Sequence, residues 1–220
     1  DDSGSMRWGF MPDELVTRLV INDVNILKNC NAVVNFGGNN NLCAYDLTGH
    51  RYLTSSYANQ SYYNPEIVYL PPVSADGSLF PNVSFTAAPV DGYSSNSAVV
   101  NLQSAYRALM DNYYYAAQDA SNTWRYGFTV SPNANAGQAF YHKFNVSCVS
   151  EDTAVIEANK FKDECYEHVT VGSSEQQNFA NWFSYYRTRL MSSKAGIGRA
   201  FQQQGDGMRL GYGAINTNPV

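Results

Sequence analysis

The longest helical pattern in the chain lies near its C-terminal end and limits the folds that the chain can adopt. Between residues 175 and 203, apolar side chains recur every three or four positions, at Phe179, Phe183, Tyr186 and Leu190. Ser174 and Gln177 form a capping-box pattern at the start of this stretch. A helix with a single apolar face must pack against a neighbouring element. We therefore predict one helix over residues 175–203 that packs on a sheet, followed by a strand over residues 208–215.

The first six residues, DDSGSM, contain three oxygen-bearing side chains at alternate positions. Asp1, Ser3 and Ser5 could place one carboxylate and two hydroxyls on one side of a hard divalent cation. Mg²⁺ fits this donor set best, with Mn²⁺ or Ca²⁺ as alternatives. Asp, Ser and Gly are also the residues of an ordinary turn. The hexapeptide alone leaves both interpretations open.

This hexapeptide resembles the metal-ion-dependent adhesion site (MIDAS) of von Willebrand factor A (vWA) domains. In those domains the loop follows the first strand of a doubly wound sheet, at the edge where such folds bind ligands. The resemblance assigns metal binding to Asp1, Ser3 and Ser5. The remaining family ligands, a Thr and an Asp from later loops, are absent from the 220 residues. The chain is therefore expected to be a fragment of a vWA domain, and residues 1–6 should lie beside the strand at residues 208–215.

Further segments resemble the N-terminal region of the PilC/PilY family of type IV pilus tip adhesins. They are YNPEIVYLPP (63–72), PNVSFTAA (81–88), QNFANWFSYYRTRLMSSKAGIGRAF (177–201) and RLGYG (209–213). The resemblance implies an α/β fold with a vWA-like doubly wound sheet, only partly contained in this chain. Residues 1–6 would form the metal loop, residues 7–174 a large, mixed, loop-rich insertion, and residues 175–220 the first vWA helix and the following strand.

The four cysteines form no metal-binding or redox motif, because no two of them are close in sequence. The spacing favours two local disulfides, Cys30 with Cys43 and Cys148 with Cys165, among three possible connectivities. Each would stabilise the fold by about 3 kcal/mol. The alternative is four buried free thiols. Disulfides would indicate a protein outside the cytoplasm.

Within the insertion, a short helix is expected over residues 11–27 and strands over residues 67–70 and 139–146. Residues 102–118 fit either a helix or a strand. The chain holds 17 tyrosines, which could form an adhesive surface or pack the core of the insertion.

Charge and composition exclude several functions. The formal net charge is −5 and the pI is about 5.1, so the chain lacks the basic surface that nucleic-acid binding needs. No apolar run approaches the roughly 20 residues of a membrane span, and no signal peptide is expected within these residues. His50, His142 and His168 are scattered without zinc-ligand spacing. No nucleophile elbow surrounds Ser3. The chain is therefore predicted not to be an enzyme.

The resemblance implies a pilus tip-associated adhesin that is exported through the periplasm and outer membrane to the bacterial cell surface. Its implied partners are minor pilins and host-cell or surface ligands, and its implied roles are attachment and pilus assembly and retraction. The alternative is a non-catalytic assembly or mechanosensing module that binds minor pilins, with a structural or vacant metal loop. A vWA subunit of a metal-handling or chaperone complex is a third class, which the cysteine pattern disfavours.

Overall fold

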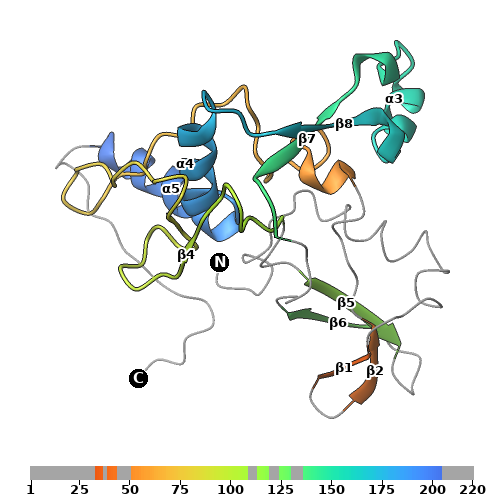
Figure 1. The fold of residues 1–220 in the computed structure, drawn as a ribbon, viewed down its shortest axis with the longest axis horizontal. Helices are drawn as coiled ribbons and strands as arrows, with labels where there is room; N and C mark the ends of the chain where they lie inside the picture. The colour runs from red at the N-terminus through yellow and green to blue at the C-terminus, as the bar shows by residue number, and fades with distance from the viewer. Residues whose placement is uncertain are drawn as a thin grey trace.

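The computed structural model describes residues 33–36, 39–43, 51–108, 113–118, 124–129 and 136–204. In these residues the chain is mixed α/β, as the sequence predicts. Figure 1 shows helices α4 and α5 together at one end, and the β7–β8 ladder with helix α3 at the other. The pairs β1–β2 and β5–β6 lie close to each other, apart from the helices.

The elements are short and are joined by long irregular segments. The strands are β1 (Val33–Phe36), β2 (Asn39–Cys43), β3 (Ala88–Pro89), β4 (Val99–Val100), β5 (Tyr113–Gln118), β6 (Trp124–Thr129), β7 (Phe140–Phe144) and β8 (Tyr166–Thr170). The α-helices are α3 (Thr153–Asn159), α4 (Gln176–Tyr185) and α5 (Arg189–Gln202). Single 3₁₀ turns form η3 (Arg51–Thr54), η4 (Val146–Cys148) and η5 (Asp163–Cys165).

Within the described residues the strands pair only two by two and only antiparallel: β1 with β2, β3 with β4, β5 with β6, and β7 with β8. The β7–β8 register places Phe140 opposite Thr170 and Phe144 opposite Tyr166. The loop at residues 1–6 and the strand at residues 208–215, on which the predicted vWA-like sheet depends, lie outside the described residues. The doubly wound sheet therefore stays a prediction.

One aromatic core holds the described helices and loops together, with α4 at its centre. Phe179 and Phe183 of α4 are fully buried. The ring of Phe179 meets those of Tyr63, Tyr106 and Trp182, with centroids 4.8 to 5.4 Å apart. The tyrosines that are buried in this core are Tyr52, Tyr62, Tyr63, Tyr106, Tyr141, Tyr166 and Tyr185. These rings pack the interior and do not form an adhesive surface.

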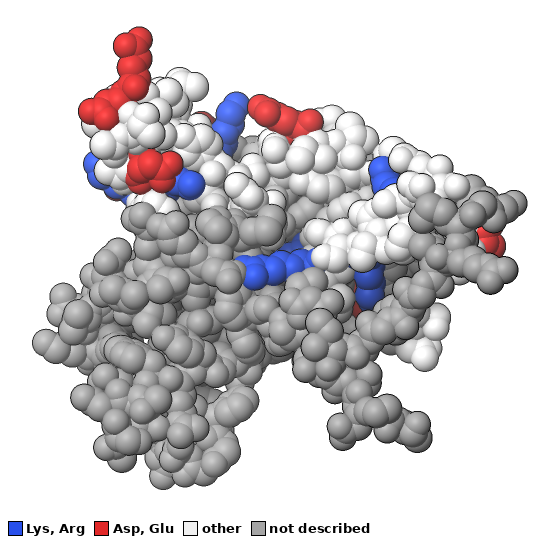
Figure 2. All heavy atoms as spheres, turned by 180° about the vertical axis from the view of Figure 1, so that it is seen from behind, with Lys and Arg blue, Asp and Glu red and all other residues white. Residues whose placement is uncertain are grey.

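Among the described residues, charged groups are sparse on the face that Figure 2 shows. Acidic side chains project there from the end that carries α3, where Glu151, Asp152 and Glu157 are exposed. No basic stripe crosses the described surface in this view. This surface agrees with the acidic composition of the chain.

The prediction of a single helix over residues 175–203 is wrong, because the helix is interrupted between Tyr185 and Arg189, which gives two helices, α4 and α5. Thr188 is extended, and its side chain accepts a hydrogen bond from the Met191 N–H, as an N-cap residue does. The Arg187 guanidinium caps the end of α4 by donating to the Phe183 carbonyl at 2.7 Å. Helical spacing continues across the break, so the sequence periodicity does not reveal it.

Two details of the predicted helix are also wrong. The helix α4 begins at Gln176, and the side chain of its N-cap residue, Glu175, does not cap the helix, so the Ser174–Gln177 capping box does not form. Gln177 instead donates to the carbonyl of Val83 at 2.9 Å. Leu190, the last residue of the predicted apolar face, is exposed. A tertiary contact therefore takes Gln177 away from its predicted local role.

The predicted strand at residues 139–146 is confirmed as β7. The ambiguous stretch at residues 102–118 ends in strand β5. The predicted strand at residues 67–70 is wrong, because this segment is irregular and its backbone bonds to side chains of α4. The predicted helix at residues 11–27 lies outside the described residues.

Candidate functional site

Polar side chains on α4 hold two loops against the helix, and we call this set of contacts the α4 junction. The Asn178 amide accepts from the Tyr69 N–H and donates to the Ile67 carbonyl, both at 2.7 Å. The Asn181 amide donates to the Tyr69 carbonyl at 2.9 Å and accepts from the Val83 N–H at 3.0 Å. These bonds take the place of a neighbouring strand. They explain how both loops can be irregular while their backbone N–H and C=O groups still have hydrogen-bond partners.

Hydroxyl groups at the end of α4 extend this junction. Tyr185 donates to the Pro81 carbonyl at 2.9 Å, and Tyr186 donates to the Leu70 carbonyl at 2.5 Å. Arg199 of α5 donates to the same Leu70 carbonyl at 3.0 Å. The junction therefore joins the segments 63–72, 81–88 and 177–201, which lie far apart in the sequence. The fourth segment that carries the family resemblance, residues 209–213, lies outside the described residues.

A cleft of about 400 Å³ opens beside β7, next to this junction. One wall is formed by residues 55–57 and another by residues 64–66, and four consecutive residues of β7 complete the lining. The lining residues are Ser55, Ser56, Tyr57, Asn64, Pro65, Glu66, Tyr141, His142, Lys143 and Phe144. We call this site the β7 cleft. Its size lies within the range of ligand-binding clefts.

Residues 57–63 wrap around β7 and thereby bring both walls of the cleft to it. The Tyr57 ring stacks on Phe144, with centroids 4.0 Å apart and planes 3° apart. The Tyr62 hydroxyl donates to the Phe140 carbonyl at 3.0 Å, and the Tyr63 ring meets Tyr141 at 5.4 Å. The segment therefore passes from one face of the β7–β8 ladder to the other.

His142 at the floor of the cleft is held neutral. Its Nδ1 lies 2.6 Å from the Thr54 hydroxyl, and the residue is buried. Burial is the main reason that the pKa of His142 falls from 6.5 to about 4, and His168 and Arg51 lower it further. Asp163 opposes the shift. The imidazole therefore carries no proton charge at neutral pH.

Tyr141 is the second titratable group of the floor. Its hydroxyl donates to Glu175 Oε1 at 3.2 Å. Burial and the neighbouring Glu175 carboxylate raise the pKa of Tyr141 to about 12. Neither His142 nor Tyr141 therefore changes protonation near pH 7.

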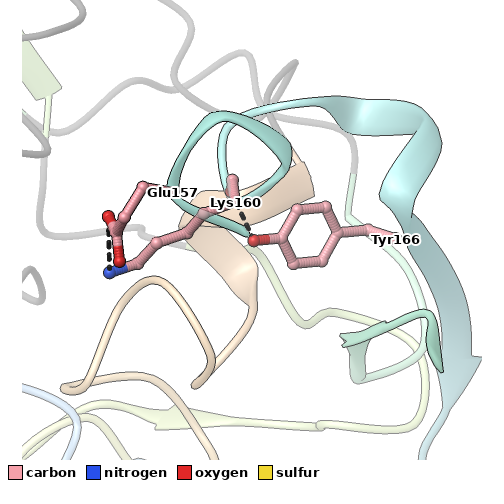
Figure 3. Close-up of polar contacts among 3 residues, drawn as sticks. All are labelled: Glu157, Lys160 and Tyr166. Carbon is pink, nitrogen blue, oxygen red and sulfur yellow. Dashed lines mark hydrogen bonds and ion pairs between the residues drawn. The ribbon is translucent and has the colours of Figure 1, made fainter. Parts of the chain in front are cut away.

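A disulfide closes the far end of the β7–β8 ladder. Cys148 and Cys165 are bonded, with Cα atoms 5.7 Å apart, which confirms the sequence prediction for this pair. Helix α3 lies in the loop between the two cysteines. Figure 3 shows the Tyr166 hydroxyl donating to the Lys160 carbonyl at 2.5 Å, while the Lys160 ammonium lies 4.0 Å from Glu157. These bonds fix α3 on the start of β8.

Several predicted site residues lie outside the described residues. These are Asp1, Ser3 and Ser5, and also Cys30, while the side chain of Cys43 in β2 is not described either. Cation binding and the Cys30–Cys43 pair therefore stay predictions. Within the ranges that the structure describes, no three His, Cys, Asp or Glu side chains gather in a way that could hold a metal. No helix in these ranges combines the length and apolar character of a bilayer crossing.

Sequence reasoning missed the β7 cleft. Residues 64–66 belong to a segment that resembles the family, and β7 was expected as a strand, so part of the lining carried a signal. Residues 55–57 carried none. Their position depends on the wrap around β7, which no local pattern encodes.

Comparison with known proteins places the chain among proteins of type IV pili. It is 30% identical over 224 residues to the type IV pilus biogenesis factor PilY1 of Pseudomonas aeruginosa strain UCBPP-PA14, and 26% identical over 226 residues to that of strain PAK. Each match covers 99% of this chain. No family model and no solved structure matches the chain.

The matches run from end to end of the chain and agree with the resemblance that its segments carry. The chain belongs to the PilC/PilY family. It spans 15% and 16% of the length of the two relatives.

Proposed function

We propose that this chain is a non-catalytic recognition region of a type IV pilus protein that is displayed outside the bacterial cell, at the pilus tip. The observation that carries the proposal is the match of 99% of the chain to proteins named type IV pilus biogenesis factor. The Cys148–Cys165 disulfide supports an oxidising location outside the cytoplasm. The pKa values of His142 and Tyr141 in the β7 cleft are both far from 7, which supports binding over acid–base catalysis.

Attachment to host cells or surfaces is the first form of this function. In it, Asp1, Ser3 and Ser5 would hold a divalent cation, Mg²⁺ before Mn²⁺ or Ca²⁺, in a vWA-like domain that this chain contains in part. A bound cation would supply open coordination positions for an acidic group of the ligand. The α4 junction and the disulfide would keep the region folded when the pilus pulls on it.

Assembly is the second form of this function, and the name of the relatives, type IV pilus biogenesis factor, favours it. In this form the region binds minor pilins and the metal loop is structural or vacant. The β7 cleft and the α4 junction would then carry the contact. Retraction and twitching motility would depend on the same contact.

The two forms are separated by replacing a single carboxylate. We would introduce Asp1→Ala into the full-length protein, with Asp2→Ala as the matched control, because Asp2 is not among the three predicted ligands. The cation-dependent form predicts that Asp1→Ala abolishes adhesion and that Asp2→Ala does not. Titration calorimetry with Mg²⁺, Mn²⁺ and Ca²⁺ would show whether binding is lost in the same variant.

The assembly form predicts a different result in the same strains. Adhesion and twitching would be unchanged by Asp1→Ala, and minor pilins would be recovered with the protein in the presence of a chelator. If pili form and function normally when residues 1–220 are deleted, both forms of the proposal are wrong.

A further inference from the structure

We propose that the β7 cleft binds an extended peptide segment of a partner protein, which adds to the β7–β8 ladder as a third strand along the outer edge of β7. This inference goes beyond the pilus function and does not depend on it. It rests on the hydrogen bonding of β7 and on the shape of the cleft.

The hydrogen bonds at the two ends of the ladder fix which backbone groups of β7 face outward. The Val171 N–H donates to the Ala139 carbonyl at 2.9 Å, and the Asn145 N–H donates to the Cys165 carbonyl at 2.8 Å. In an antiparallel pair, hydrogen-bonded positions alternate with positions whose N–H and C=O point away from the partner. Tyr141 and Lys143 therefore bond to β8, whereas His142 and Phe144 direct their backbone groups outward.

These outward groups have no partner in the described part of the chain. The carbonyl of Phe140, which faces the same way, accepts from the Tyr62 hydroxyl. No such bond is made by the N–H or C=O of His142 or Phe144 within the described ranges. Two donors and two acceptors at a spacing of two residues are what a neighbouring strand pairs with.

The cleft lies along this edge and not on a face of the ladder. Side chains of a strand alternate between its two faces, so a cavity on one face would touch every second residue. The cleft touches all four consecutive residues from Tyr141 to Phe144. At about 3.3 Å per residue, these four residues offer an edge about 10 Å long. Three or four residues of an extended peptide would match that length.

The walls of the cleft indicate the side chains that the peptide should carry. The stacked rings of Tyr57 and Phe144 lie at one end, where a neighbouring β-branched or aromatic side chain would pack across the strands. Glu66 and Lys143 line the cleft with opposite charges. The peptide should therefore be apolar at alternate positions and carry no strong net charge.

The test uses the 220-residue chain and a random library of ten-residue peptides displayed on phage. Peptides selected on the wild-type chain would be synthesised, and their affinity measured for two variants. Ser56→Trp places an indole in the cleft, and Ser104→Trp places the same group on an exposed loop outside it. Circular dichroism would confirm that both variants fold. We expect at least a tenfold loss of affinity in Ser56→Trp and no loss in Ser104→Trp.

Amide hydrogen exchange measured by NMR gives a second readout that a side-chain contact alone would not produce. Binding should protect the amides of His142 and Phe144, and leave those of Tyr141 and Lys143 unchanged, because the latter are already bonded to β8. The proposal is overturned if no selected peptide depends on Ser56. It is also overturned if protection appears instead at His168 and Thr170, on the outer edge of β8.

Discussion

Asn181 ties three parts of the chain together with one buried amide group. It bonds to Tyr69 and Val83 from the middle of α4, and its Nδ2 also lies 3.0 Å from Asn82 Oδ1. An asparagine in a helix interior has no local advantage. Its value here is tertiary, since it satisfies the backbone of two loops that have no strand partner.

Replacing Asn181 with Ala should therefore leave the Tyr69 carbonyl and the Val83 N–H without these hydrogen-bond partners. We expect a loss of about 2–4 kcal/mol in the free energy of unfolding, measured by urea denaturation. Asn101→Ala is the matched control, because Asn101 is exposed and its side chain bonds locally, accepting from the Gln103 N–H at 2.9 Å. That control should lose less than about 1 kcal/mol. Equal losses in the two variants would contradict the role of the junction.

His142 makes the stability of the fold depend on pH. The pKa of His142 is about 4 in the folded chain, against an ordinary value of 6.5. Between these values the unfolded state binds a proton that the folded state does not, so stability falls as pH falls from 6.5 to 4. His168, Arg51 and Asp163 are the charged or titratable groups that act on it.

The check on His142 is the urea midpoint measured between pH 4 and pH 7 for the wild type and for His142→Gln. Glutamine can keep a hydrogen bond to the Thr54 hydroxyl and does not titrate. The variant should show a smaller decline in midpoint over this interval. If the decline is the same in both proteins, other groups cause it.

At the scale of elements, a disulfide and a hydrogen bond restrain the β7–β8 ladder at the end where α3 lies. The disulfide joins residues 17 positions apart, and the Tyr166 hydroxyl holds the end of α3. The helix itself is short, and Asp152 caps it by accepting from the Ala154 N–H at 2.8 Å. An element of this length depends on such restraints.

Replacing both Cys148 and Cys165 with Ala should lower the free energy of unfolding by about 3 kcal/mol, because the unfolded chain gains the freedom of a 17-residue loop. Urea denaturation measures the loss, and mass spectrometry after thiol labelling confirms that the wild-type bond is present. Adding a reductant to the wild type should cause at least the same loss, because it would also open the predicted Cys30–Cys43 bond. A variant as stable as the wild type would show that the bond does not restrain the fold.

At the scale of the whole molecule, α4 connects the loops, the β3–β4 pair and the β7–β8 ladder through one core. Phe179 meets rings from residues 63, 85, 106 and 182. A core that is shared in this way should unfold as one cooperative unit.

Phe179→Ala should cost about 4 kcal/mol and raise amide exchange together in β7, β8 and residues 102–106. Phe201→Ala is the matched control, because Phe201 of α5 is 47% exposed, and it should cost less than about 1 kcal/mol. Faster exchange confined to α4 would show that the described elements unfold independently.

The sequence by itself determined the features that depend on near neighbours or on the family. These are the mixed α/β class, strand β7, the Cys148–Cys165 bond and the family membership. Alternation, cysteine spacing and matching segments are local signals and can be read along the chain.

Only the tertiary structure decided the break between α4 and α5, the irregular course of residues 67–70 and the β7 cleft. In each case distant groups satisfy the backbone or supply a wall. At the break, the Gly92 N–H donates to the Ser184 carbonyl near the end of α4, at 2.9 Å. Asn178 and Asn181 replace the strand partner of residues 67–70, and the wrap of residues 57–63 around β7 creates the cleft. Such contacts join residues more than 70 positions apart, so the periodicity of either segment alone does not contain them.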